Sequence, residues 1–156
     1  MRSYKVNHQD FKGAYIQMTI RTSKRKKRIC STTSLRKKLW SAFFSPYVRL
    51  KEGYRCYTCG KQLTKETSQA GHFRHKDCLD FFEPNIHCQG SCCNTYRSGN
   101  LAIYAEKLET QYGYGIIQQI NKLADEAKPL KRQELLDKIE YYKNELAKLQ
   151  TTHVSY

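Results

Sequence analysis

Cysteines near the middle of the chain are spaced as metal ligands. Cys56 and Cys59 are separated by two residues, which lets both sulfurs reach one tetrahedral ion, and Gly60 permits the tight turn that follows. A redox-active thiol pair is the alternative, but no βαβ pattern surrounds this one. A second cysteine cluster, residues 88–93, follows after a loop of about thirty residues. The two clusters together predict a structural zinc site.

The second cysteine cluster departs from the regular spacing. A C-x-x-C pair that ends at Cys93 would need a cysteine at position 90, where Gly90 stands. Cys88 would point to the same side of an extended strand as position 90, so it could supply the missing thiolate. Cys92 is the rival ligand. The predicted zinc ligands are Cys56, Cys59, Cys88 and Cys93, whereas Cys30 and Cys78 are predicted to be ordinary small side chains.

Histidines and asparagines lie between or beside the two cysteine clusters. They are His72, His75, Asn85, His87 and Asn94. A neutral histidine can take a proton from water so that the water attacks phosphorus, and a hard divalent ion can stabilise the charge that develops. An asparagine can bind such an ion or orient a histidine ring. Taken singly, each histidine could instead complete the zinc site or be an ordinary polar residue. The ordered set favours phosphodiester cleavage.

The excess of positive charge gathers in the first two fifths of the chain. The sequence has 28 basic and 14 acidic side chains, a net charge of +14. Residues 1–61 carry 16 basic and 2 acidic side chains, whereas residues 62–156 carry 12 of each. This asymmetry indicates a polyanionic partner, with nucleic acid more favoured than an anionic membrane. The predicted phosphate contacts in the arm are Lys24, Arg25, Lys26, Lys27 and Arg28, for which a solubilising tail or a localisation signal is the alternative.

Helical patterns flank the cysteine-rich segment. Ser31 to Ser34 offer N-cap residues, and a helical pattern runs from Leu35 until Pro46 breaks or kinks it, after which residues 47–51 could continue it. Short strands, turns and metal loops are predicted for residues 53–100, and a strand is predicted for residues 14–20. Helices are expected over about 101–112, 116–127 and 131–150. The last carries a heptad seam that would pack on its own domain or form a dimer contact, made of Leu135, Ile139, Tyr142, Leu146 and Leu149.

Two classes of protein are disfavoured. No run of about 18 apolar residues exists, so no transmembrane helix is expected. Residues 2–10 are polar and lack the apolar region of a secretory signal. We therefore expect a cytoplasmic protein without a membrane partner, in a reducing compartment where clustered cysteines more often bind metal than form disulfides.

The order of these motifs resembles the HNH (ββα-metal) nuclease motif. It consists of Cys-x-x-Cys, then His, then Asn, then a second cysteine pair followed at once by Asn. Over roughly half the chain, several stretches more narrowly resemble the lambda-type NinG/Rap phage recombination family. They are Leu35–Leu50, Cys56–Gly60, Ala70–Phe73, Asn85–His87, Gln89, Cys93–Asn94 and Ser98–Leu101.

The resemblance implies an activity and roles for single residues. Members of this family are structure-specific endonucleases that act on branched recombination intermediates such as Holliday junctions and D-loops. His72 would be the general base, Asn85 would steady the loop and that histidine, and Asn94 would bind Mg²⁺ or Mn²⁺. His87 would bind the same ion or contact the scissile phosphate. The HNH pattern often has an acidic metal ligand just before the base, and here that residue is Gly71, so the metal site must be built differently. Further candidate phosphate contacts are Arg74, His75, Arg97 and Asn100.

These inferences predict an α+β fold with a small zinc-stabilised HNH (ββα-metal) core flanked by an N-terminal helix and C-terminal helices. The expected divisions are a basic arm (1–34), the nuclease core (35–113) and a helical region (114–156). Since a junction needs one cut in each of two strands, a homodimer is expected, with a monomer that nicks at a single site as the alternative. The alternatives to a branched-DNA endonuclease are a non-catalytic zinc-stabilised nucleic-acid-binding protein and an HNH nickase without branch preference.

Overall fold

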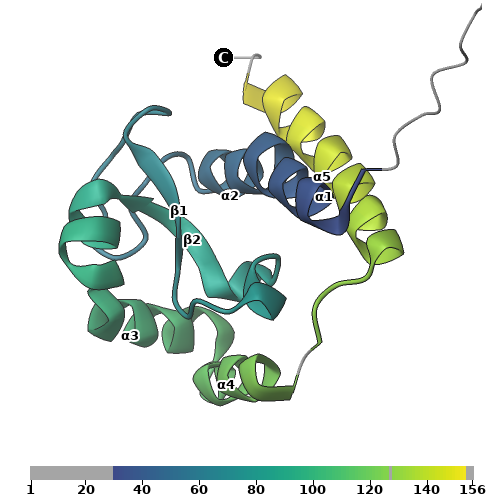
Figure 1. Ribbon diagram of the computed structural model, residues 1–156. Coiled ribbons are helices and arrows are strands. Elements are labelled where there is room, and N and C mark those ends of the chain that lie inside the picture. Colours follow the sequence, from purple (N-terminus) through teal and green to yellow (C-terminus); the bar gives the residue numbers. More distant parts are fainter. Residues whose placement is uncertain (1–29, 127, 154–156) are drawn as a thin grey trace, which may run out of the picture.

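The computed structural model describes residues 30–126 and 128–153 (Figure 1). The predicted strand over 14–20 and the cationic run over 24–28 lie outside the described residues. Two segments are π-helical, Leu39–Phe44 and Cys92–Tyr96. The other principal elements are α1 (Thr32–Lys38), α2 (Ser45–Lys51), β1 (Ser68–His72), β2 (Ile86–Gly90), α3 (Leu101–Tyr112), α4 (Ile116–Glu126) and α5 (Arg132–His153).

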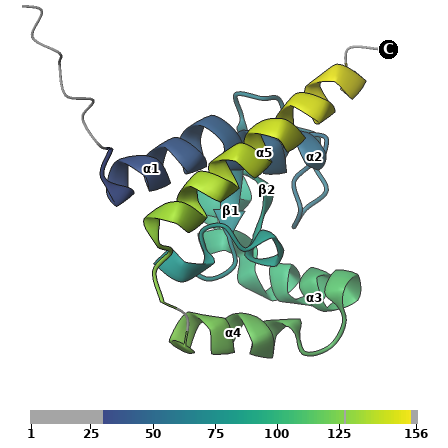
Figure 2. The same cartoon turned by 90° about the vertical axis from the view of Figure 1, so that its right-hand side faces the viewer.

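A two-stranded antiparallel sheet lies at the centre of these helices. In its register, Ser68 of β1 pairs with Gly90 of β2, and His72 pairs with Ile86. The helices α1, α2 and α5 form a layer on one side of the hairpin, and α3 and α4 lie on the other (Figures 1 and 2). This arrangement of helices around a small sheet confirms the predicted α+β class.

The first helical run continues through Pro46 rather than breaking there. Proline removes a backbone donor and clashes with the carbonyl four residues earlier, so it is tolerated only where the helix is adjusted. The adjustment is the π-helical turn, in which the Ser45 N–H bonds to the Trp40 carbonyl five residues back. Pro46 then occupies the first turn of α2. Because the backbone stays helical, Leu39, Phe44 and Val48 enter one apolar cluster.

The C-terminal helix completes that cluster. Leu135, Tyr142 and Leu146 of its heptad seam are buried against α1, the π-helical turn and α2, and Ile139 and Leu149 pack at the edge. Figure 2 shows α5 lying across this pair of helices. The seam therefore packs on its own chain, which is one of its two predicted uses. The seam is therefore not free to form the dimer contact that the sequence suggested. The homodimer itself stays a prediction.

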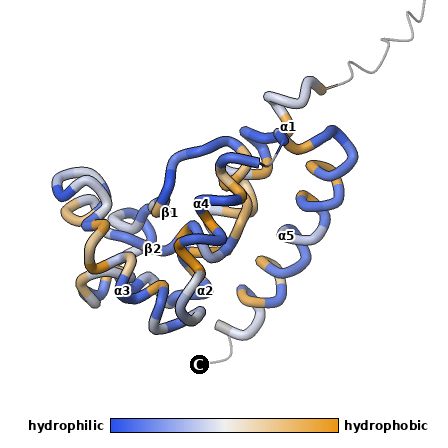
Figure 3. The backbone as a smooth tube through the Cα atoms, turned by 90° about the horizontal axis from the view of Figure 1, so that it is seen from below, coloured by the Kyte–Doolittle hydropathy of each residue, from blue (hydrophilic) through white to orange (hydrophobic). Residues whose placement is uncertain are grey.

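A second apolar cluster joins α3 and α4. It contains Leu79, Tyr104, Leu108, Ile116, Ile120 and Ala124. The helix α5 is mostly hydrophilic along its length with recurring apolar positions (Figure 3), as expected for a helix that buries one stripe. Among the helices of the described residues, none is long and apolar enough to cross a membrane.

Candidate metal centre and hairpin site

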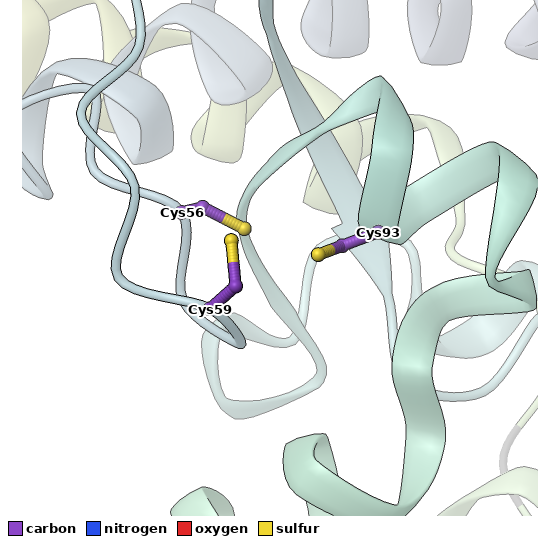
Figure 4. A group of neighbouring side chains, drawn as sticks. All are labelled: Cys56, Cys59 and Cys93. Atoms are coloured by element: carbon purple, nitrogen blue, oxygen red, sulfur yellow. The ribbon is translucent and has the colours of Figure 1, made fainter.

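Three thiols converge beside the sheet. The sulfurs of Cys56, Cys59 and Cys93 all lie within 4.8 Å of one another (Figure 4). Cys56 and Cys59 sit on a tight turn, in which the Gly60 N–H bonds to the Cys56 carbonyl at 2.8 Å and Gly60 has a φ of 75°. Glycine adopts such a positive φ without steric penalty. This cluster could hold a metal ion such as zinc, because thiolates are preferred zinc ligands.

The protein environment shifts the pKa values of Cys56 and Cys93 in opposite directions. Burial by itself would raise the pKa of Cys56, but the backbone N–H groups of Cys59 and Gly90 donate hydrogen bonds to its sulfur and lower the pKa to about 6. Burial raises the pKa of Cys93 to about 11, with the neighbouring thiols adding to the effect. Metal binding would therefore displace a proton from Cys93, as it does whenever a neutral thiol becomes a ligand.

The two candidates for a fourth zinc ligand occupy different places. Cys88 is fully buried on β2 and lies outside the group of three thiols. Its backbone is fixed on both sides, because its N–H donates to Glu52 Oε2 at 2.7 Å and its carbonyl accepts from the Tyr57 N–H at 2.7 Å. Cys92 is exposed and lines a cavity of about 320 Å³ together with Cys56 and Cys59. Both lie outside the group of three thiols, so the choice between Cys88 and Cys92 stays open.

The predicted histidines lie on opposite faces of the hairpin. Side chains alternate along a strand, and residues that pair across an antiparallel sheet share a face. Gly71 pairs with His87, so these two share the face toward α3, where the rings of His87 and Tyr104 are 5.7 Å apart. The neighbouring His72 lies on the other face, where Trp40 stacks on it at 4.9 Å between ring centroids.

His72 is held in a defined orientation. Its ring is nearly parallel to Trp40, at 16°, and its side chain is only 14 % exposed. Nε2 lies 3.4 Å from Asp80 Oδ1 but makes no hydrogen bond among the described residues, and the other oxygen of Asp80 accepts a hydrogen bond from Arg36 at 2.6 Å. The ring of His75, which is exposed, lies 4.9 Å from that of His72 between centroids.

Asn85 braces the loop that connects the strands. Its side chain is completely buried. Oδ1 accepts from the Arg74 N–H at 2.9 Å, and Nδ2 donates to the Arg74 carbonyl at 3.0 Å. The Phe73 N–H adds a bond to the Asn85 carbonyl at 2.8 Å. These bonds tie the segment after His72 to the start of β2, and the role in catalysis that was expected for Asn85 stays a prediction.

His87 is paired with a carboxylate. Its Nδ1 lies 2.5 Å from Glu52 Oε1, and its ring stacks on Tyr57 at 3.8 Å. Nε2 is buried and has no hydrogen-bond partner among the described residues. A histidine whose far nitrogen is held by a carboxylate is the usual arrangement around a metal-binding imidazole. Sequence analysis missed Glu52, although it is one of only two acidic side chains in residues 1–61.

Amide side chains gather around Gly71. Asn94 Nδ2 donates to Gln69 Oε1 at 2.7 Å, and Gln89 Nε2 donates to the Gly99 carbonyl at 2.8 Å. A Cβ on Gly71 would lie 2.1 Å from Gln89 Oε1 and 2.9 Å from Asn94 Oδ1. The space beside the Gly71 backbone is therefore filled by two amide oxygens that come from β2 and from the π-helical turn.

The predicted phosphate-binding arginines differ in availability. Arg74 bonds to Asn121 through its guanidinium and pairs with Asp125 at 3.3 Å, so it ties the loop to α4. Arg97 is exposed in the turn after the π-helical segment. The run over 24–28 lies outside the described residues. Of the predicted cations, Arg97 is thus the one in the described residues whose side chain is open to a phosphate.

Comparison with known proteins points to one family. Residues 7–152 match the family model described as bacteriophage lambda NinG protein. Curated relatives include the protein NinG of Escherichia phage lambda and that of Salmonella phage P22, each 38% identical to this chain over 68 residues. That stretch is 42% of this chain and 33% of each relative, so the match spans a third of the relatives' length. No solved structure matches the chain.

Proposed function

The chain belongs to the bacteriophage lambda NinG family, and from that premise we propose that it is a metal-dependent endonuclease acting on branched DNA, such as Holliday junctions and D-loops. The observation that carries the proposal is the environment of His72 at the end of β1, an imidazole stacked on Trp40 with the carboxylate of Asp80 at 3.4 Å from its Nε2. A stacked imidazole beside a carboxylate is suited to act as a general base.

Asp80 determines which nitrogen of His72 does the chemistry. A proton on Nε2 would face the Asp80 carboxylate, and Nδ1 would then carry the lone pair that accepts a proton from water. The carboxylate would also stabilise the imidazolium that forms, as in other carboxylate–histidine pairs. Asp80 is thus a positioning residue in this proposal, and its own orientation is held by Arg36 at 2.6 Å.

The two faces of the hairpin suit an in-line displacement. In such a reaction the attacking water and the leaving oxygen lie on opposite sides of phosphorus. A phosphate bound over the Gly71–His72 backbone would meet the base on one face and the oxygen of Asn94 on the other. Asn94, with His87 as a second candidate, would hold Mg²⁺ or Mn²⁺, which when bound neutralises negative charge on the phosphate oxygens. The carboxylate behind His87 supports that assignment.

Zinc has a structural role in the proposal. Cys56, Cys59 and Cys93 would bind it, with Cys92 or Cys88 completing the set. The ion would fasten the C-x-x-C turn to the π-helical segment that carries Asn94, in a part of the molecule without a large apolar core. The basic arm, Lys37, Lys38 and Arg97 would supply phosphate contacts, and the host cytoplasm would be the site of action.

A cleavage assay tests this function. Labelled four-way junction and matched linear duplex would each be incubated with wild type, His72→Ala and Gln119→Met, in Mg²⁺ and in EDTA. We expect Mg²⁺-dependent junction cutting that falls about 10²- to 10⁴-fold in His72→Ala, while junction binding survives. Gln119 is exposed on α4, and none of the proposed site residues lies on that helix, so Gln119→Met serves as the matched control. Undiminished cutting by His72→Ala would show that another group is the base.

A non-catalytic DNA-binding protein is the second candidate. The observation in its favour is the burial of His72, whose side chain is 14 % exposed, which is low for a group that must meet water and phosphate. Tight junction binding without cutting in either Mg²⁺ or Mn²⁺ would replace the nuclease with this function. If linear duplex competes as well as the junction and is also cut, the protein is instead a nickase without branch preference.

A further inference from the structure

We propose that the side-chain oxygen of Gln89 takes the place of the acidic ligand that Gly71 cannot provide, and that Gln89 and Asn94 together form an oxygen site for a divalent cation such as Mg²⁺ or Mn²⁺. The inference deepens the proposed nuclease function and rests on it. It concerns a residue for which neither the motif nor the family resemblance supplied a role.

The position of the two oxygens supports a shared ligand. Gln89 Oε1 and Asn94 Oδ1 lie 2.1 and 2.9 Å from the point where a Cβ on Gly71 would be, so they are at most about 5 Å apart. Mg²⁺ binds oxygen at about 2.0–2.1 Å and Ca²⁺ at about 2.3–2.6 Å, so one small cation can contact both oxygens after little movement. Amide oxygens are suitable ligands for such hard ions.

The orientation of the Gln89 amide follows from its hydrogen bonds. Gln89 Nε2 donates to the Gly99 carbonyl at 2.8 Å, and a carbonyl can only accept, so the amide nitrogen must face Gly99. Gln89 Oε1 is thereby turned toward Gly71. Asn94 Nδ2 donates to the side-chain amide of Gln69 at 2.7 Å, and in this orientation Asn94 Oδ1 faces Gly71 as well.

Gln89 Oε1 is a buried acceptor that lacks a partner. The residue is completely buried, and this oxygen has no hydrogen bond among the described residues, although both directions of its amide nitrogen are used. Buried polar atoms in native proteins are nearly always satisfied by protein, water or an ion. A cation between this oxygen and Asn94 would satisfy it.

The zinc loop helps to hold Gln89 in this orientation. Thr58 lies between the two cysteines of the C-x-x-C turn, and its Oγ1 is 3.6 Å from the Cys56 sulfur and 3.2 Å from Gln89 Nε2. Thr58 therefore connects the thiol cluster to the amide. Loss of zinc should weaken cation binding without any direct contact between the two ions.

The test measures Mn²⁺ binding, by electron paramagnetic resonance of free Mn²⁺, to the zinc-loaded full chain. Gln89→Met keeps the length of the side chain and removes its oxygen, and we expect the Mn²⁺ dissociation constant to rise at least about tenfold. Gln119→Met, the matched control, should stay within about twofold of wild type. Zinc content and thermal melting of each variant report whether the fold is retained.

A second set of variants replaces the amide oxygen of Gln89 on β2 with a carboxylate oxygen at position 71 on β1. Gly71→Asp alone should disturb the site, because its Cβ would lie 2.1 Å from Gln89 Oε1, and Mn²⁺ binding should weaken. Combined with Gln89→Ala, the aspartate gains room, and we expect Mn²⁺ binding to recover to at least the wild-type affinity. This recovery does not depend on how well Gln89→Met folds.

The outcomes separate this inference from the nuclease function. Equal Mn²⁺ affinity of wild type and folded Gln89→Met, or no recovery in the double variant, would overturn the inference even if wild type cuts junctions. Absence of Mn²⁺ binding by wild type would overturn it as well. Conversely, Gln89-dependent Mn²⁺ binding without any DNA cleavage would leave the cation site standing and remove the nuclease function.

Discussion

The two faces of the β1–β2 hairpin are built by different means. The face toward α1, α2 and α5 meets a dry cluster of aromatic and aliphatic side chains, in which Phe44 packs edge-on against Phe81 and Tyr142. On the face toward α3, the sheet contributes Gly71, His87 and Gln89, and the two long side chains are buried and polar. One face is thus shaped by packing and the other by hydrogen bonds.

This difference indicates which face of the hairpin should depend on bound ions for its stability. Apolar surface is stabilised by leaving water and needs no specific partner. A buried polar atom needs a partner, because its desolvation is otherwise uncompensated. Within the described residues, His87 Nε2 and Gln89 Oε1 are unpartnered on the polar side of the hairpin, and His72 Nε2 is unpartnered on the other side, 3.4 Å from a carboxylate oxygen of Asp80. We therefore expect the polar face, with its adjoining thiol cluster, to depend on metal and the apolar face to be independent of it.

The largest effect should come from removing zinc. A strong chelator, or Cys93→Ser, should release the metal and unfold the C-x-x-C turn and the segment after β2, since structural zinc contributes about 10–16 kcal/mol of binding energy in small zinc domains. Most of the helical circular dichroism should persist, because the cluster under α1, α2 and α5 contains no thiol. Cys30→Ser, at an exposed cysteine, is the control for zinc content. Loss of all structure in a single transition when zinc is removed would show that the apolar face also depends on metal.

A cavity in the apolar face should have the next largest effect. Phe44 is 0 % exposed, and Phe44→Ala should lower the free energy of unfolding by about 3–5 kcal/mol. The bound zinc should remain at wild-type stoichiometry at temperatures where the protein is folded. Tyr141→Ala, at an aromatic side chain that is 52% exposed, is the matched control and should have a much smaller effect on urea unfolding. Zinc loss from folded Phe44→Ala would mean that the faces are not independent.

A smaller effect is expected where a carboxylate supports the polar face. One carboxylate oxygen of Glu52 lies within hydrogen-bond distance of His87 Nδ1, and the other accepts a hydrogen bond from the Cys88 N–H. Glu52→Gln keeps the shape but replaces one acceptor with a donor, so it should cost about 1–3 kcal/mol in urea unfolding. Glu140→Gln, at an exposed position of α5, should leave the urea midpoint unchanged. An unchanged midpoint in Glu52→Gln as well would show that His87 is held by ring stacking alone.

The sequence predicts best what depends on short spacing. The turn at Cys56 and Cys59, the buried positions of α5 and the helix boundaries near 101–112 all follow from local patterns. Pro46 was expected to break or kink its helix, because a π-helical turn has no simple sequence signal. Asp80 and Glu52 were missed since they support histidines across the fold, and nothing beside them in the sequence marks those partners. The role proposed for Gln89 could not be predicted from the sequence, because it depends on the space beside Gly71, which the oxygen of Gln89 reaches only in the folded chain.

One paired measurement tests the central claim, that the base and the cation ligands lie on opposite faces. Single-turnover cutting of a four-way junction and Mn²⁺ affinity would be measured on His72→Ala and Asn94→Ala, with zinc content verified in both. The account predicts that His72→Ala loses cutting while its Mn²⁺ affinity is unchanged, whereas Asn94→Ala loses both. Loss of Mn²⁺ affinity in His72→Ala comparable to that in Asn94→Ala would contradict the account, because His72 would then be a metal ligand rather than the base.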